Sequence, residues 1–248
     1  MTPSPATTGG APDRGAPPRA FDGGRRERGK RAKLKRIKRA ARKLFIVRGF
    51  EGTTTRAIAK AADIGAGTLF LYAVTKADLL VLIFREEVGA AVDRAIETMP
   101  APVRRAEPIL LDQIMHVFAA MIAHHRENPG LARVFVKELP FVDDARHGVD
   151  QFMRDLYAHM AWLIDDAKAR GELRATVSST MLAHNLFALY FQFLQRWLGG
   201  TNPDGANRNG EATTNRGATS YKDLNETYLR DSLELQLSGL RDTSTSSR

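Results

Sequence analysis

One segment of the chain, from Thr54 to Lys76, constrains the fold more than any other and reads TTRAIAKAADIGAGTLFLYAVTK. It consists of a short Ala-rich helical pattern, a break at Asp63 and a second short helical pattern that begins near Gly65. Thr54 is a suitable N-cap for the first pattern, because its hydroxyl can accept a hydrogen bond from the first helical turn. Two short helices joined by a tight turn predict a helix-turn-helix. The apolar side chains expected to set the angle between the two helices are Ile58, Ile64 and Leu69.

A strongly basic helical pattern precedes this segment. From Lys30 onward, apolar residues recur at helical spacing and most other positions are Lys or Arg, until Gly49 ends the pattern. Residues 1–60 contain 17 Lys and Arg against four acidic residues, whereas the whole chain has a net charge of +9. Because the positive excess is confined to one end, that end is expected to meet a polyanion. Residues 1–29 are rich in Pro, Gly and Ala and predict a disordered basic arm.

The rest of the chain predicts an all-α fold. Helical periodicity continues from Lys76 to Met99, and no stretch alternates convincingly in the manner of a strand. Further helices are expected over residues 108–126, 129–139, 148–170, 178–198 and 221–240, with a flexible loop over 199–220. The expected organisation is an arm (1–29), a three-helix DNA-binding domain (30–76, motif 54–73) and a C-terminal helical bundle for regulation and dimerisation (77–248).

Composition excludes several classes of site. The chain has no Cys, which excludes disulfides, thiolate zinc sites and cysteine nucleophiles, and favours a reducing compartment. Neither a signal peptide nor the ~18 continuous apolar residues of a membrane span is evident. We therefore expect a cytoplasmic, nucleoid-associated protein without a membrane partner.

No motif in the chain indicates catalysis. The six His residues form no metal-ligand pattern, and no P-loop or serine nucleophile elbow occurs. The segment Gly65-Ala66-Gly67 lacks the third Gly and the preceding strand of a dinucleotide loop. We expect no enzyme activity, no catalytic residue, no metal and no cofactor, and a small-molecule effector of unknown identity.

The helix-turn-helix makes double-stranded DNA the first partner to consider. In this motif the second helix enters the major groove while the first crosses the backbone, and helix starts supply hydroxyl and N–H groups to phosphates. The predicted DNA-binding residues are Lys30, Arg31, Thr54, Thr55, Arg56, Gly65, Ala66, Gly67, Thr68, Phe70, Tyr72 and Lys76.

The second helix of the motif contains few side chains that read bases. From Ile64 to Thr75 there is no Arg, Lys, Asn or Gln, the residues that make bidentate base contacts. Specificity is therefore expected from Thr68, from Tyr72 and from the methyl group of Ala66. Cations of the arm would add contacts in a minor groove, and these are Arg25, Arg26, Arg28, Lys30 and Arg31.

Aromatic and Met-rich helices in the C-terminal part supply candidate ligand contacts. Ordinary core packing is the commoner role of such residues, but a small-molecule pocket is lined by the same types. The candidate ligand-binding residues are Met115, Phe118, Phe135, Met153, Tyr157, Trp162, Phe187 and Tyr190.

Residues 181–198 are apolar on nearly every side of a helix, which indicates that one face needs a partner. Together with the last helix they predict the four-helix interface of a two-fold homodimer. The candidate interface residues are Leu186, Phe193, Trp197, Tyr228, Leu233 and Leu237. A two-fold dimer of helix-turn-helix domains predicts a near-palindromic operator.

Residues 36 to 80 resemble the N-terminal DNA-binding domain of the tetracycline-repressor (TetR) family. The matching elements, in order and at the family's spacing, are Ala41, Leu44-Phe45, Gly49-Phe50, Thr53-Thr54, Ile58-Ala59, Ala62, Gly67-Thr68-Leu69, Tyr72, Lys76 and Leu79-Leu80. The departures are Asp63 for the usual Gly of the turn, Gly65 for a Ser cap, Phe70 for Tyr, and Ala73 for an aromatic residue. The resemblance implies a homodimeric, ligand-responsive transcription factor with a ligand-binding C-terminal bundle.

The sequence thus predicts a transcriptional regulator, more specifically a repressor that a small molecule releases from its operator. Two alternatives remain. The first is a DNA-compacting architectural protein that uses the basic end without sequence specificity. The second is a small-molecule enzyme with an appended DNA-binding domain.

Overall fold

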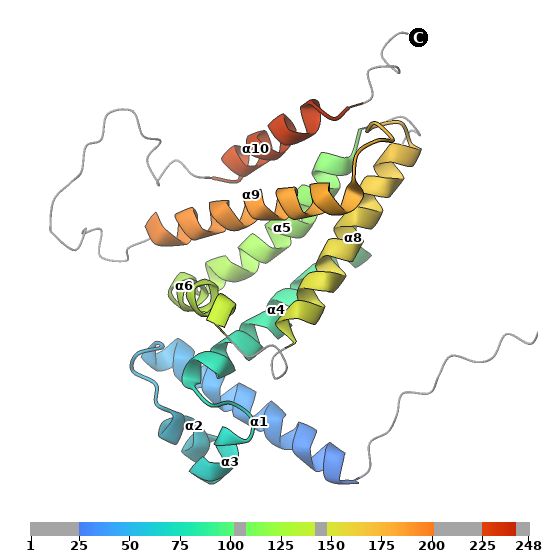
Figure 1. The fold of residues 1–248 in the computed structure, drawn as a ribbon. Coiled ribbons are helices and arrows are strands. Elements are labelled where there is room, and N and C mark those ends of the chain that lie inside the picture. The colour runs from blue at the N-terminus through green and yellow to red at the C-terminus, as the bar shows by residue number, and fades with distance from the viewer. Residues whose placement is uncertain (1–24, 102–107, 142–147, 201–224, 242–248) are drawn as a thin grey trace, which may run out of the picture.

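The computed structural model describes residues 25–101, 108–141, 148–200 and 225–241, and within these ranges the chain is helical (Figure 1). The elements are α1 (Arg25–Arg48), α2 (Thr55–Ala61), α3 (Ala66–Phe70), α4 (Lys76–Glu97), α5 (Leu110–Glu127), α6 (Pro129–Glu138), the 3-10 turn η1 (Leu139–Phe141), α8 (Val149–Ala169), α9 (Ser179–Gly200) and α10 (Glu226–Ser238). Apart from a single β-bridge between Leu173 and Arg241, the described ranges contain no strand pairing. The predicted all-α fold is confirmed. No helix in these ranges combines the length and hydropathy needed to cross a membrane.

The first helix begins earlier than the sequence predicts. α1 starts at Arg25, so residues 25–29 of the expected disordered arm are helical, whereas residues 1–24 lie outside the described ranges. Once residues from Lys30 onward form a helix, each further residue adds a hydrogen bond at little cost, and Arg and Glu are good helix formers. Low apolar content alone was therefore a poor guide to this boundary.

Two helix starts are fixed by side-chain caps. Thr54 accepts a hydrogen bond from the backbone N–H of Ala57 at 3.1 Å, as the sequence predicts for the start of α2. At the start of α4, Thr75 accepts from the Asp78 N–H at 3.0 Å, and the Asp78 carboxylate accepts from the Thr75 N–H at 2.8 Å. This reciprocal capping box sets the residue at which the connecting helix α4 begins.

The molecule consists of a small N-terminal unit, α1 to α3, beneath a bundle formed by α4 to α10 (Figure 1). α4 starts in the small unit and runs into the bundle, where it packs against α5, α6 and α8. α10 lies across α9 and α5. Residues 201–224 lie outside the described ranges, and they include the last 20 residues of the expected loop 199–220 and the first four of the expected helix 221–240.

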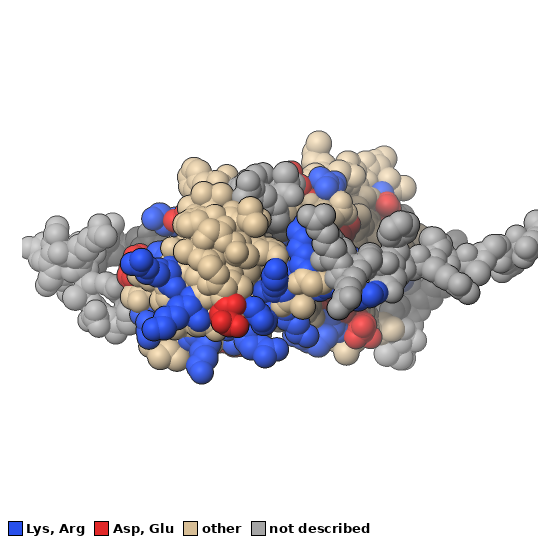
Figure 2. Space-filling model, turned by 90° about the horizontal axis from the view of Figure 1, so that it is seen from below, with Lys and Arg blue, Asp and Glu red and all other residues tan. Residues whose placement is uncertain are grey.

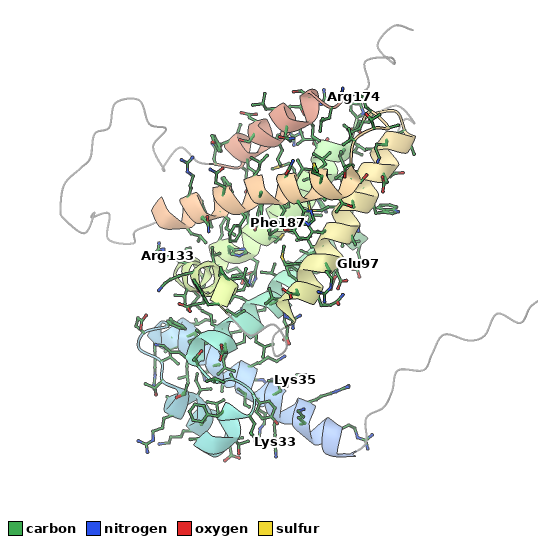
Figure 3. All side chains as sticks on the ribbon, viewed as in Figure 1. Lys33, Lys35, Glu97, Arg133, Arg174 and Phe187 are labelled. Atoms are coloured by element: carbon green, nitrogen blue, oxygen red, sulfur yellow. The ribbon has the colours of Figure 1, made fainter. Side chains whose placement is uncertain are left out.

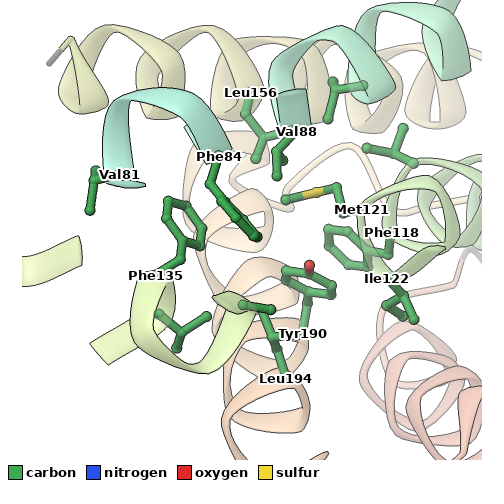
Figure 4. Packing of buried hydrophobic residues seen from close by; sticks show 14 of the residues in the cluster. Val81, Phe84, Val88, Phe118, Met121, Ile122, Phe135, Leu156, Tyr190 and Leu194 are labelled. Atoms are coloured by element: carbon green, nitrogen blue, oxygen red, sulfur yellow. The ribbon is translucent and has the colours of Figure 1, made fainter. Parts of the chain in front are cut away.

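Aromatic side chains fill the centre of the bundle (Figure 4). The rings of Phe118 and Tyr190 stack with centroids 4.5 Å apart, and those of Phe84 and Phe135 stack at 5.3 Å. All four side chains are at most 7% exposed. Burial of such large apolar surfaces, on the order of 2 kcal/mol or more per side chain, is the main stabilising contribution to this half of the chain.

One imidazole is buried in the same region. His125 is 1% exposed, and its Nδ1 contacts the carbonyl oxygen of Met121, so this nitrogen carries the proton and donates to the carbonyl. Burial lowers the pKa of His125 to about 4, the Met121 hydrogen bond raises it in part, and the neighbouring His124 lowers it further. The folded protein therefore holds His125 neutral at pH 7.

Acidification is expected to destabilise the fold through His125. Its pKa is lowered in the folded state, so the unfolded chain binds the proton more readily, and stability falls as the pH drops from 6.5 towards 4. This group alone should contribute a loss of about 3 kcal/mol across that range. The measurement is urea unfolding of the wild type and of His125→Gln at several pH values. A pH dependence that is identical in the two proteins would contradict the assignment.

Candidate nucleic-acid interface

The helix-turn-helix consists of α2 and α3 joined by a turn at Asp63. Ile58 and Leu69 are fully buried between the two helices and α1, and Ile64 is partly buried against the same cluster. Asp63 adopts a left-handed conformation with φ of 52°. This conformation is costly for most residues, but Asp tolerates it better than most, which explains how the turn forms without Gly.

The turn is also held from outside by α1. The Arg36 guanidinium donates to the carbonyl oxygen of Asp63 at 3.1 Å. The hydroxyl of Tyr72, after α3, lies 3.5 Å from the carbonyl oxygen of Lys30 on α1. The basic helix is thus part of the scaffold that orients α3, in addition to carrying charge.

Two cations of α1 bind the bundle. Lys38 pairs with the carboxylate of Glu86 at 2.5 Å, and Arg42 pairs with Glu87. The sequence shows both cations only as part of the basic helical pattern that starts at Lys30, because helical periodicity separates them from the apolar positions but does not show which neighbour faces them. The adjacent carboxylates Glu86 and Glu87 on α4 were the sequence feature that could have indicated partners for these cations. These ion pairs connect the DNA-binding unit to the helix that enters the bundle.

The same junction continues to α5. The His124 Nε2 lies 3.5 Å from the Glu87 carboxylate, and Glu127 lies 3.9 Å from the Arg42 guanidinium. Four charged or titratable groups from α1, α4 and α5 therefore meet at one corner of the molecule. Movement of α4 or α5 within the bundle changes the environment of Arg42, and so of α1.

Lys76 is directed inward by the structure. Its ammonium group donates to the carbonyl oxygen of Phe50 at 2.8 Å, lies 4.3 Å from the centre of the Phe50 ring and lies 3.3 Å from the Glu51 carboxylate. The sequence placed this cation against a phosphate. In the structure it joins the start of α4 to the loop between α1 and α2, which is a positioning role.

The other predicted DNA-binding residues lie on or directly beside α1, α2 and α3, in the small unit whose underside Figure 2 shows. The exposed members are Lys30, Arg31, Thr54, Arg56, Gly65, Ala66, Gly67 and Phe70, and the partly buried ones are Thr55, Thr68 and Tyr72. The segment that follows α3 also exposes large apolar groups that the sequence analysis did not select, since Leu71 is 78% and Val74 is 54% exposed. Together with Phe70, which is 48% exposed, they form a group of exposed apolar side chains, and a contiguous group of this kind can mark a contact surface.

A groove of about 460 Å³ lies beside the turn, between α1 and the end of α2. Three cations of α1 line it, namely Arg36, Arg39 and Lys43. The sequence analysis noted the basic character of these positions but not the groove, because its other wall comes from α2. Figure 3 shows Lys33 and Lys35 farther toward the N-terminus of the same helix.

The candidate ligand-binding residues fall into three environments. Buried members are Met115, Phe118, Phe135 and Tyr190, and partly buried members are Met153, Tyr157 and Phe187. Trp162 is 61% exposed on α8, so its inclusion is corrected here: it lies on the outer face of that helix and does not line the bundle interior.

Two features of the bundle suit a small molecule. The hydroxyl of Tyr190 is buried without a hydrogen-bond partner among the described residues, and burial raises its pKa. An open cleft of about 520 Å³ lies between α4 and α8, with Gly89 and Ile96 on one wall and Phe152 and Leu156 on the other. Its volume is within the range of small-molecule sites.

Most of the predicted dimer residues are buried within one protomer. Leu186 and Phe193 on α9, and Leu233 and Leu237 on α10, are at most 2% exposed, because α9 and α10 pack on each other and on α5. These four assignments are corrected, since such side chains cannot reach a second chain. Trp197 is partly buried, and of the predicted set Tyr228 remains exposed, at 38%.

Comparison with known proteins gives a family match for the small unit. Residues 37–83 match the family model described as bacterial regulatory proteins, tetR family. The match covers the second half of α1, all of α2 and α3 and the first two turns of α4, which are the elements that form the geometry above.

The remaining similarity is at the level of the fold. The fatty acid metabolism regulator protein of Bacillus subtilis (strain 168) is 22% identical over 170 residues, which are 68% of this chain and 85% of that protein. FadR of Thermus thermophilus, a TetR-family transcriptional repressor solved with lauroyl-CoA, has a TM-score of 0.58 at 23% identity, covering 87% of this chain and 100% of that one. FadR of Bacillus subtilis, solved with stearoyl-CoA, has a TM-score of 0.54 at 18% identity, covering 84% and 99%.

The inward position of Lys76 leads to a stability prediction. Lys76→Met removes the bond to the Phe50 carbonyl and is expected to lower the free energy of unfolding by about 1–2 kcal/mol. Lys60→Met, at an exposed position of α2, serves as the control and should change it by less than about 0.5 kcal/mol. Chemical denaturation measures both. Equal effects of the two substitutions would show that the Lys76 contact is not stabilising.

Proposed function

We propose that the chain is a homodimeric transcriptional repressor of the TetR family, which a small molecule releases from a near-palindromic operator. The match of residues 37–83 to the model of the tetR family of bacterial regulatory proteins supports this proposal. The observation that carries the proposal is that α4 belongs to both parts of the molecule. It starts against the small N-terminal unit and then forms a wall of the 520 Å³ cleft in the bundle. A ligand that separates α4 from α8 changes the position of α3 through one continuous helix.

The surface of α3 favours apolar readout of the DNA. Phe70, Leu71 and Val74 are exposed, and Thr68 and Tyr72 supply hydroxyl groups beside them. Apolar side chains in a major groove contact the methyl group of thymine, whereas guanine is read mainly by Arg or Lys. The half-site is therefore proposed to be rich in A·T pairs.

The dimer is proposed to form through the outward side of α9 and the adjoining edge of α10. Met181 on α9 is 66% exposed, and Tyr228 and Leu235 on α10 are 38% and 77% exposed. Tyr228 and Leu235 are two helical turns apart on one face of α10, opposite its buried stripe. This face replaces the buried residues that the sequence selected, and its two-fold pairing sets the spacing of the half-sites.

The effector is proposed to be an amphiphilic molecule of the acyl-CoA class, with its apolar acyl chain inside the bundle. The support is the open cleft between α4 and α8, whose walls include the apolar side chains of Ile96, Phe152 and Leu156, together with the acyl-CoA esters bound in the two FadR structures. The proposal includes no catalytic step. We also propose a cytoplasmic, nucleoid-associated location, because a regulator of transcription binds the chromosome.

Selection of binding sites from random duplex DNA at about 0.15 M salt tests the DNA-binding part. We expect a near-palindrome with A·T-rich half-sites about one helical turn apart, because two copies of α3 must enter successive major grooves. Phe70→Ala with Leu71→Ala should weaken binding to the selected site at least tenfold and binding to random duplex much less. Binding without sequence preference would instead favour the architectural alternative.

Release from the selected operator tests the effector part. Lauroyl-CoA or stearoyl-CoA should lower operator affinity at least tenfold, and Gly89→Leu, which fills the α4–α8 cleft, should abolish the response while operator binding persists. Gly130→Leu on α6 is the control, because an added Cβ there meets no atom within 4 Å. Full response in Gly89→Leu would place the effector elsewhere, and conversion of the added compound would support the enzyme alternative.

A further inference from the structure

The groove between α1 and the end of α2 carries a row of cations. Arg36, Arg39 and Lys43 line it, Asp63 is the one carboxylate among its lining residues, and its volume is about 460 Å³. Its floor is formed by small and apolar side chains, Ala40, Leu44, Ala61 and Ala62. The groove is therefore shaped by apolar contacts and bordered by positive charge.

The three cations are regularly spaced along one face of α1. Positions 36, 39 and 43 are three and four residues apart, so they follow one another at each helical turn and span about 10 Å along the axis. Successive phosphates of one B-DNA strand are about 3.4 Å apart along the duplex axis. The row thus matches the length of about three phosphates.

These cations are available to an external anion. Among the described residues, Arg36, Arg39 and Lys43 form no ion pair, whereas Lys38 and Arg42, on the face of α1 that meets α4, are paired with Glu86 and Glu87. Arg36 uses its guanidinium for the carbonyl of Asp63, which fixes it at the edge of the groove.

The position of this charge differs from the position of base readout. The segment from Ile64 to Thr75, which contains α3, has no cation, and Figure 2 shows Lys and Arg side chains gathered around a tan, uncharged area on this side of the molecule. Positive charge for phosphates therefore lies beside the reading helix. A duplex held by α3 alone would leave the row of α1 cations unused.

We propose that the α1–α2 groove binds a stretch of DNA backbone outside the base pairs that face α3. The proposal rests on the proposed function, since it requires the protein to bind an operator. The groove contributes affinity and salt dependence without reading sequence, because phosphates are the same at every step. The bound DNA is therefore longer than the palindrome that selection reveals.

The test compares two duplexes and two double variants. One duplex contains the selected palindrome alone, and the other adds about ten base pairs on each side. Arg39→Ala with Lys43→Ala removes two groove cations and retains Arg36, which holds the turn. Lys137→Ala with Arg154→Ala, at exposed positions of α6 and α8, is the matched control.

On the long duplex, the groove variant is expected to lose at least tenfold in affinity at about 0.1 M salt, and the slope of log K against log salt should fall by about two per protomer. On the short duplex, the groove variant should bind like the wild type, and the control variant should match the wild type on both.

Three results overturn the proposal. No loss on the long duplex shows that the groove binds no DNA. An equal loss on both duplexes shows that the cations act on the half-site itself. Failure of the wild type to prefer any palindrome over random duplex overturns the proposed function, and this outcome is distinct because it precedes any comparison of variants.

Discussion

The packing of α1 against the remaining helices is the contact on which the arrangement depends. Ile37, Ala41 and Phe45 are at most 1% exposed and place α1 against the helix-turn-helix on one side and α4 on another. Apolar burial supplies the stabilisation but is non-directional, so it fixes separation better than rotation about the helix axis. The paired Lys38–Glu86 and Arg42–Glu87 contacts supply direction, since they have partners at defined positions on α4.

The charge of the small unit is divided by this packing. Cations on the α4 side of α1 neutralise carboxylates of the same chain, whereas Arg36, Arg39 and Lys43 on the α2 side form no ion pair among the described residues. Net charge alone would assign all of them to DNA. The distinction matters for salt dependence. Salt that screens the internal ion pairs changes the free energy of unfolding, whereas salt that screens the external cations changes the affinity for DNA.

The sequence predicted local features well and non-local ones poorly. The helix-turn-helix, the Thr54 cap and the turn at Asp63 depend on residues a few positions apart, so their patterns are complete within a short segment. The buried positions of α9 and α10 were assigned to a second chain because periodicity shows that a helix has an apolar side but not which helix covers it. In the structure, Leu186 and Leu233 are buried in the core of one protomer, because α9 and α10 cover each other.

The same limit applied to single side chains. Trp162 was selected for its type and is exposed, whereas Lys76 was placed against DNA by its position and is held by the Phe50 carbonyl. The capping box of Thr75 and Asp78 could have been found from the sequence, because its residues are three apart and precede an apolar run.

The length of α1 gives the junction a mechanical consequence. The helix has 24 residues, or about 36 Å, and its ion pairs with α4 lie toward its C-terminal half. The far end lies about 23 Å from these ion pairs, so a rotation of about 5° around the anchored half displaces it by about 2 Å, comparable to the helix shifts that accompany switching in other proteins. A displacement of this size is enough to separate the Tyr72 hydroxyl from the Lys30 carbonyl while the buried residues of α1 stay packed. The positions of the ion pairs along α1 therefore determine how far a small rotation moves its N-terminal end.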